Sequence, residues 1–407
     1  MFLPDRRDDL GEVVQALSDT APRVIRYEIT GSALAEALVS SHAAVVNRVS
    51  DATVDFSAHG GSGVVEGETH LAGLRGSLLT LRTLHGDSPP AQAVLATRSI
   101  ARWAEDRGHP QTALRFLALA AQLVRDEPTG WIRAGRVARL AADYRAAEAF
   151  LAEAILLGEK LQDQSALARA HSSLGNVALQ RGNYPRAREL HERCLEFAHA
   201  AGERELIANA NHDLLIIQGE AGDLAEAMRH ARAAFAAYGA HHPKLNDLAH
   251  DIGAVLAKHG DYRGALRVHE ALLPVYRSSE NLVLIWSAIG LCAGALGNAE
   301  LFHRARAAVD DIIAAAAHAV EPHARALMAI ATGASRLRLW QQAEEVAAAA
   351  LALAESRSEG EVVISADLVM AAARRNYGAV PDEQRNQSDA PFVEALIAAV
   401  NEQPAGR

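Results

Sequence analysis

The sequence predicts an all-α protein, built as a right-handed α-solenoid of antiparallel helix pairs with helical caps. Three observations lead to this prediction: a short phrase recurs along the chain, half of the residues are apolar with alanine abundant among them, and aromatic residues make up only 5%. Residues 181–187 read Arg-Gly-Asn-Tyr-Pro-Arg-Ala, and residues 259–265 read His-Gly-Asp-Tyr-Arg-Gly-Ala. Each copy ends one helical pattern and begins another, and repeated helix–turn–helix units stack into solenoids.

One turn residue in each unit marks the period of the repeat. The turn residues are Gly108, Ala142, Gly182, Gly222, Gly260, Gly297 and Arg338. Successive turns lie 34 to 41 residues apart. Glycine at this place ends a helix, because it adopts the left-handed conformation without steric cost. We expect about seven repeats over residues 89–356.

The repeat combines a small residue in its first helix with further small residues in its second helix. The clearest unit has Leu174-Gly175 in the first helix, Tyr184 at the turn, and Ala187 and Cys194 in the second helix. This pattern resembles the tetratricopeptide repeat family. The unit near Leu215 carries a large residue where the small one is expected.

The last two units depart further from the pattern. Phe302 stands where an alanine should fall, with Ala305 three residues later, and Arg338 replaces the glycine of the final turn. Steps near 40 residues predict helices about a turn longer than in the common form of the repeat. The Arg-rich, Lys-poor composition suggests a bacterial source.

The two ends of the chain fit the repeat less well. Residues 1–88 are interpreted as a helical cap or a degenerate repeat region, with the remnant of another domain as an alternative. Residues 357–378 are expected to form a C-terminal capping helix, because an array needs a helix that closes its end. Residues 379–407 are expected to form a linker and a short terminal helix.

The composition argues against several classes of function. A net charge of −10 disfavours nonspecific binding to nucleic acid or to an anionic membrane. The two cysteines, Cys194 and Cys292, are too far apart for a disulfide framework or a metal knuckle. The N-terminus has no long apolar core and no apolar stretch reaches the roughly 20 residues of a membrane span, so we expect a cytoplasmic protein. The oligomeric state stays open.

No catalytic, metal or cofactor site is expected. The glycine-rich residues 59–63 lack the ending of a phosphate-binding loop and the spacing of a nucleophile elbow, so they are interpreted as a flexible connection. His191 and Cys194 share a helix face and are interpreted as core residues rather than metal ligands. The pairs His212-Asp213 and His250-Asp251 recur in consecutive units; helix-surface hydrogen bonding is favoured over acid–base chemistry.

The resemblance implies that the first helices line a concave face, and in such arrays this face commonly holds peptides. It assigns the following candidates to a peptide-binding groove: Arg136, Arg139, Arg169, Asn176, Gln180, Asn209, His212, His250 and Lys258, with Asp247 and Arg133 beside them. Arginines can bind a carboxylate in a fork and asparagines can pair with peptide backbone, so an acidic or carboxylate-ended peptide is one expected ligand. The alternative is a solvated face whose cations pair with neighbouring Glu and Asp side chains.

The leading functional hypothesis is a non-enzymatic protein–protein interaction scaffold that binds a peptide or protein segment. A peptide-sensing regulatory protein without its own DNA-binding domain is the alternative, because long-helix repeats resemble the sensor halves of bacterial transcription regulators. An enzyme is the third and least favoured hypothesis. Ser172 stands one turn before Asn176, so the Lys-plus-Asn clamp for chaperone tails is not matched.

Overall fold

The computed structural model describes residues 90–106, 110–315, 324–357, 360–377 and 390–403. Regular secondary structure in these ranges is helical throughout, and the predicted all-α solenoid is confirmed. The chain divides after Glu203 into two compact units. The segment 1–88, the turn residue Gly108 and the connection 379–389 lie outside the described residues.

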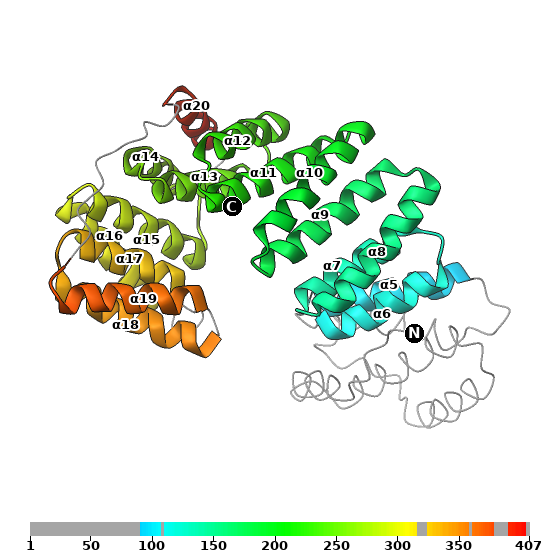
Figure 1. Ribbon diagram of the computed structural model, residues 1–407, viewed down its shortest axis with the longest axis horizontal. Helices are drawn as coiled ribbons and strands as arrows, with labels where there is room; N and C mark the ends of the chain where they lie inside the picture. The colour runs from blue at the N-terminus through cyan, green and yellow to red at the C-terminus, as the bar shows by residue number, and fades with distance from the viewer. Residues whose placement is uncertain (1–89, 107–109, 316–323, 358–359, 378–389, 404–407) are drawn as a thin grey trace, which may run out of the picture. The chain divides into compact units, whose positions relative to one another are not determined.

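Fourteen of the helices form seven consecutive pairs within the described ranges, three in the first unit and four in the second (Figure 1). The first unit contains α5 (Pro90–Glu105), α6 (Pro110–Leu123), α7 (Pro128–Leu140), α8 (Tyr144–Leu161), α9 (Gln164–Gln180) and α10 (Tyr184–Ala201). The second contains α11 (Arg204–Ala221), α12 (Leu224–Tyr238), α13 (Leu245–Lys258), α14 (Tyr262–Leu272), α15 (Ser279–Ala295), α16 (Ala299–Ala315), α17 (Ala324–Arg336) and α18 (Trp340–Arg357).

Most of the described turns inside a pair combine a left-handed residue with a side-chain helix cap. The six turn residues that the structure describes all have positive φ: Ala142, Gly182, Gly222, Gly260, Gly297 and Arg338. At five of these turns the next residue, an Asp or Asn, caps the second helix with its side chain; for example, Asp261 Oδ1 accepts the N–H of Gly264 at 2.9 Å. Leu339, which follows Arg338, has no side-chain acceptor. Such a bond satisfies one of the amides that a helix start leaves without a partner.

The two helices of a pair approach closely where the first contributes glycine. A Cβ added at Gly253 would lie 2.6 Å from Cε1 of His269, and one added at Gly175 would lie 2.5 Å from Nε2 of His191. In both pairs the contacted residue follows the glycine by sixteen positions. Sixteen residues after Leu215 the chain has Ala231, and both of these side chains are completely buried. The large residue at 215 is therefore matched by a small one on the opposite helix.

Alanines on the second helices form much of the core. Ala147, Ala187, Ala227 and Ala265 are completely buried near the start of their helices. His191 and Cys194 are also completely buried, which confirms their interpretation as core residues. Phe302 and Ala305 are both fully buried, so α16 keeps a small contact residue but displaces it by one turn.

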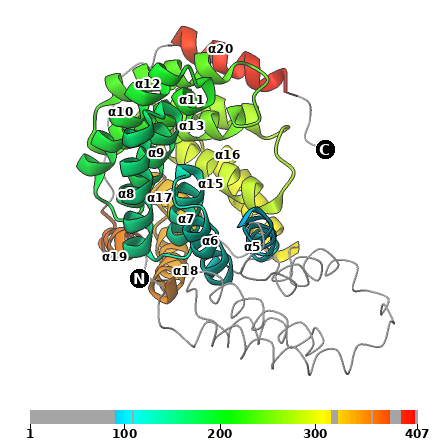
Figure 2. The same ribbon diagram turned by 90° about the vertical axis from the view of Figure 1, so that its right-hand side faces the viewer.

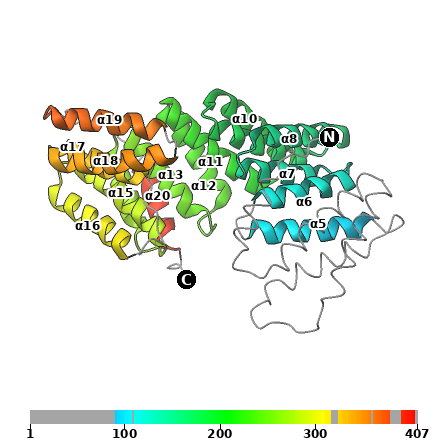
Figure 3. The ribbon, with the colours of Figure 1, turned by 90° about the horizontal axis from the view of Figure 1, so that it is seen from below.

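Two helices follow the last pair. Helix α19 (Gly360–Arg374) packs against α17 and α18, and Figure 3 shows these three side by side. Its outward side chains include Ile364 and Leu368, which are 64% and 66% exposed, so the outer face of this helix is not uniformly polar. Helix α20 (Ala390–Asn401) instead packs against α13 and α14, and Figures 1 and 2 show it next to α12. No helix in the described part of the chain is long and apolar enough to cross a membrane.

Candidate functional site

A cluster of polar side chains lies on the first helices of two consecutive pairs in the second unit, α11 and α13. We call it the α11–α13 polar face and define it by Asn209, His212, Tyr238, Lys244 and Asp251. Asn209 and His212 lie one turn apart on α11, Asp251 lies on α13, and Tyr238 and Lys244 flank the turn between α12 and α13. The helix spacing thus brings side chains from three segments together.

Asn209 is held by two donors. Its Oδ1 accepts hydrogen bonds from the hydroxyl of Tyr238 and from Nζ of Lys244, both at 2.7 Å. An asparagine side chain has one acceptor oxygen and a separate NH2 donor group. No hydrogen bond among the described residues uses Nδ2 of Asn209, so this half-buried side chain keeps its donor group for a ligand.

His212 pairs across repeats. Its Nε2 lies 2.8 Å from Oδ2 of Asp251 on the next first helix, while its Nδ1 lies 3.5 Å from the hydroxyl of Tyr238. The expected partner by sequence adjacency was Asp213. The interpretation as helix hydrogen bonding therefore holds for His212, but the bond joins two repeats. Sequence neighbours on a helix point about 100° apart, whereas residues on stacked helices face each other.

The surroundings of Tyr238 keep its hydroxyl protonated. Burial raises the pKa of Tyr238, and the carboxylates of Asp213, Asp247, Glu205 and Asp251 raise it further. Its ring stacks on His242 with centroids 4.4 Å apart. The chain of Tyr238, His212 and Asp251 thus resembles a proton relay in connectivity, but a phenol held protonated is a poor nucleophile. Its hydroxyl acts as a fixed donor to Asn209.

The same arrangement is repeated with changes in the next pair. Tyr276 reaches back 29 residues to Asp247, as Tyr238 reaches back to Asn209, although the hydroxyl lies 3.4 Å from Oδ1. Burial and the Asp247 carboxylate raise the pKa of Tyr276. His250 occupies the position of His212, but its ring lies 5.5 Å from that of His269, and burial lowers its pKa.

The candidate residues of the first unit contact acidic neighbours. Arg133 Nη2 lies 2.8 Å from Glu105 Oε1, and Arg136 Nη2 lies 3.9 Å from the other oxygen of that carboxylate. Arg169 Nη2 lies 2.8 Å from Glu203 Oε2. These contacts are the ones that the solvated-face interpretation predicts. They reduce the positive charge expected for binding an acidic peptide.

The remaining candidates are distributed along the same helices. Arg139 is half-buried near the end of α7, Asn176 is half-buried on α9, and Gln180 is exposed at the last residue of α9. Lys258 at the end of α13 pairs with Glu220 of α11, with Nζ and Oε2 2.5 Å apart. The structure therefore joins Asn209 and His212 in one cluster and places the others separately.

Sequence reasoning missed Tyr238, Lys244 and Asp251 as members of the cluster. Tyr238 and Tyr276 follow the buried alanines Ala227 and Ala265 by eleven residues in each case. This recurrence was a signal, since a tyrosine at the end of a second helix, as Tyr238 is, or shortly after it, as Tyr276 is, can return to the first helix of its own pair. No group of three or more potential metal ligands occurs among the described residues.

A sequence model of the tetratricopeptide repeat matches residues 166–238, which span most of α9, all of α10 and α11, and α12. This segment of the chain therefore consists of tetratricopeptide repeats. Such repeats are in general protein-interaction modules rather than catalytic domains, and in this general sense the chain is a protein–protein interaction scaffold. No curated protein sequence matches the chain.

Several solved structures are similar to this chain. BtubC (BKLC) from P. vanneervenii is 20% identical, with 58% of this chain and 95% of that chain covered and a TM-score of 0.42. A tetratricopeptide repeat protein from Parabacteroides merdae is 13% identical, with 76% and 99% covered and a TM-score of 0.44. The TPR2AB domain of yeast Sti1 in complex with pHSP90 is 14% identical, with 70% and 99% covered and a TM-score of 0.29. Similarity at this level carries no argument about function.

Proposed function

We propose that this tetratricopeptide-repeat protein is a cytoplasmic, non-enzymatic scaffold that binds an extended peptide or protein segment along the first helices of its repeats. The observation that carries the proposal is the α11–α13 polar face. Its central asparagine is fixed by Tyr238 and Lys244 and still offers an amide N–H. Side chains fixed before a ligand arrives lose little conformational entropy on binding, which favours affinity.

The electrostatics of this face support a ligand rich in N–H groups. Four carboxylates surround Tyr238 and raise its pKa, from Glu205, Asp213, Asp247 and Asp251. The amide of Asn209 would donate to a backbone carbonyl, while the carboxylates would accept backbone N–H groups or a lysine or arginine side chain. We therefore propose a neutral or basic segment at α11 and α13, rather than the acidic peptide suggested by the arginines alone.

We propose that the candidate residues of the first unit form a second, separate binding surface. Arg136, Arg139, Asn176 and Gln180 lie on α7 and α9, which are also first helices of their pairs. An acidic ligand there would compete with Glu105 for Arg136 and with Glu203 for Arg169. His250 and Lys258 would border the ligand on α13.

The test is affinity capture from an extract of the source organism, with the full chain as bait. An Asn209→Leu/Asp247→Ala variant removes the fixed amide and one carboxylate. We expect a directly bound protein to be recovered at least about tenfold less well with this variant, since loss of a half-buried polar partner and a charge costs more than about 1.4 kcal/mol. An Arg136→Glu/Arg139→Glu/Asn176→Ala variant tests the first unit in the same way.

The matched control is Arg263→Ala, an exposed change on the second helix α14. Circular dichroism establishes that every bait is folded. Equal recovery of the same partners by the control and by both groove variants would contradict binding along the first helices. Loss with the α11–α13 variant alone would locate the ligand on that face.

A further inference from the structure

The C-terminal helix α20 binds the repeat array as a separate ligand would. Its buried residues are Phe392, Val393, Leu396, Ala399 and Val400, whose spacing of one, four, seven and eight positions from the first forms one helical stripe. Ile397 is partly buried beside this stripe, and the exposed side chains include Ala395, Ala398 and Glu394. Helix α20 is thus a short amphipathic helix with one apolar face.

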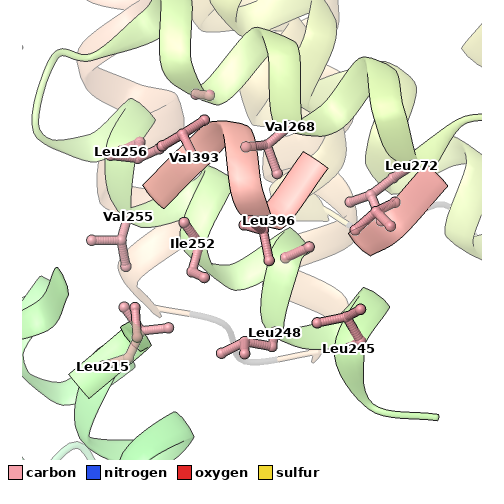
Figure 4. Close-up of a cluster of buried hydrophobic side chains, with 14 of the residues drawn as sticks. Leu215, Leu245, Leu248, Ile252, Val255, Leu256, Val268, Leu272, Val393 and Leu396 are labelled. Atoms are coloured by element: carbon pink, nitrogen blue, oxygen red, sulfur yellow. The ribbon is translucent and has the colours of Figure 1, made fainter. Parts of the chain in front are cut away.

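The array presents an apolar surface to this stripe. Figure 4 shows Val393 and Leu396 within a cluster that includes Ile252 and Val268, from α13 and α14. Helix α14 has 11 residues and α12 has 15, against 18 in α8 and α10. Since these second helices are short, the surface formed by α12, α13 and α14 accommodates an additional helix. We call it the α20-docking surface.

Aromatic and polar contacts also join α20 to this surface. The rings of Phe392 and Phe235 form a T-shaped pair with centroids 5.9 Å apart, and the guanidinium of Arg232 lies 5.5 Å from the Phe392 centroid. Arg267 pairs with Glu394, and Gln403 donates to the backbone carbonyl of Ala240. Two arginines therefore flank the first turn of α20, beside its aromatic and acidic residues.

Helix α20 is not the next element of the array. The final pair is closed by α19, and α20 returns to a surface formed by α12, α13 and α14, earlier in the array. Twelve residues, 378–389, separate α20 from Tyr377, the nearest preceding residue that the structure describes. A helix of this length has marginal stability in isolation. We therefore expect α20 to unfold when it leaves the surface. The one ion pair that joins α20 to the array among the described residues is about half exposed on both sides and adds little stability.

We propose that the α20-docking surface is a binding site for amphipathic helices, which α20 occupies in cis and which a helix of another protein occupies by displacing it. The partner helix carries an aromatic residue followed by a β-branched residue, an acidic residue two positions after the aromatic, and leucine four positions after it. This mode of recognition places an apolar helix face on an apolar surface and reads its anchors by spacing. Arg232 and Arg267 select the aromatic and acidic anchors.

The test uses the full chain and a fluorescent synthetic peptide of residues 388–403. Leu396→Asp introduces a charge into the buried stripe and undocks α20 in cis; Ala395→Asp changes an exposed neighbour and is the matched control. We expect the Leu396→Asp chain to bind the peptide at least about tenfold more tightly than the wild-type and Ala395→Asp chains. In those chains, the tethered helix competes at a high effective concentration. Equal binding by all three chains, or none by a folded Leu396→Asp chain, would overturn the proposal.

Two further measurements keep the test decisive. If circular dichroism shows that Leu396→Asp does not fold, Val393→Ala/Val400→Ala weakens docking without adding a charge and replaces it. An alanine-rich helix that carries only Phe, Val, Glu, Leu and Val at the positions of 392, 393, 394, 396 and 400 then serves as the partner. It should displace the labelled peptide, whereas a version with aspartate at the leucine position should not. Failure of the alanine-rich helix to compete would refute recognition by this pattern.

Discussion

The pairs α11–α12 and α13–α14 meet the same packing requirement with opposite residues. In the first pair the chain has Leu215 on the first helix and Ala231 sixteen positions later; in the second it has Gly253 and His269. Ala231, Leu215 and His269 are completely buried, and the ring of His269 occupies the space that a side chain at Gly253 would take. The repeat therefore keeps the combined volume of the two positions and not the residue at either one.

The comparison extends to the first unit. Gly135 is followed sixteen positions later by Leu151, and an added Cβ at Gly135 would lie 2.5 Å from Cγ of that leucine. Leucine and histidine thus serve equally as the large partner of a glycine. They differ in charge chemistry, because a leucine cannot be protonated. The residue combinations of these three helix pairs therefore suggest substitutions in one pair that copy the residues found at the same positions in another.

The largest expected loss of stability comes from increasing the combined side-chain volume of one of these packed pairs of positions. Gly253→Leu places a large side chain against the His269 ring, and we expect the free energy of unfolding to fall by about 3 kcal/mol. Adding His269→Ala recreates the Leu215 and Ala231 combination and should restore at least about 1 kcal/mol, since contacting residues couple by this amount. Chemical denaturation of the wild type, both single variants and the double variant measures this. Additive losses would show that the two positions do not share one space.

The next effect is on pH dependence. Burial, aided by His250, lowers the pKa of His269 to about 3, while an unfolded imidazole titrates near 6.5. Between these pH values the unfolded state binds a proton that the folded state does not. The free energy of unfolding is therefore fully retained above pH 6.5 and falls on acidification, by up to about 1.4 kcal/mol per pH unit.

His269→Leu recreates the glycine and leucine combination of Gly135 and Leu151, so this variant should remain folded and lose stability less steeply between pH 6.5 and 4. The measurement is denaturation at several pH values. Substitution of the exposed His241 by alanine is the control and should leave the slope unchanged. An identical slope for wild type and His269→Leu would show that His269 is not the group responsible.

A smaller effect is expected in the α11–α13 polar face, where the two pairs differ in their acidic partner. His212 has Asp251 at 2.8 Å, whereas the position equivalent to Asp251 in the following pair is Ala288. Asp251→Asn should reduce the free energy of unfolding by about 1 kcal/mol, because the imidazole loses a partly buried ionic hydrogen bond. Asp247→Asn, whose bond to Tyr276 is 3.4 Å long, should change it by less than about 0.5 kcal/mol. The reverse order of effects would contradict the pairing.

An effect of about the same size concerns the turns, where Ala142 and Arg338 adopt the conformation that glycine provides in the other described repeats. Their φ angles are 57° and 59°. Replacing either by glycine should raise the free energy of unfolding by up to about 1 kcal/mol, because a side chain is strained in the left-handed region. Gly260→Ala should lower it by a similar amount, about 1 kcal/mol. Thermal denaturation compares the three variants, and unchanged stability in all of them would remove strain as the cause.

Local features of the chain were predictable from the sequence, and contacts between distant elements were not. The positions of the turns followed from glycine spacing, because a turn is determined by the backbone preferences of a few residues. The pairing of His212 with Asp251 depends on how two repeats stack, so adjacency pointed to Asp213 instead. The ion pairs of Arg136 and Arg169 likewise depend on acidic residues from other helices. The docking of α20 depends on a surface left by short helices, which no periodicity within α20 reveals.

The caps described above have a consequence for the history of the chain. At five of the described turns within a pair, a left-handed residue and the capping residue that follows it define the end of one helix and the start of the next within a few positions. A segment of about 40 residues thus contains its own boundary signals, and its duplication or loss in frame leaves the boundaries of neighbouring segments intact. Gln403, by contrast, reaches Ala240 across 163 residues. Inserting repeats between Ala240 and α20 would increase the distance over which α20 must return to reach its docking surface. The attachment of α20 therefore restricts where additional repeats can be inserted.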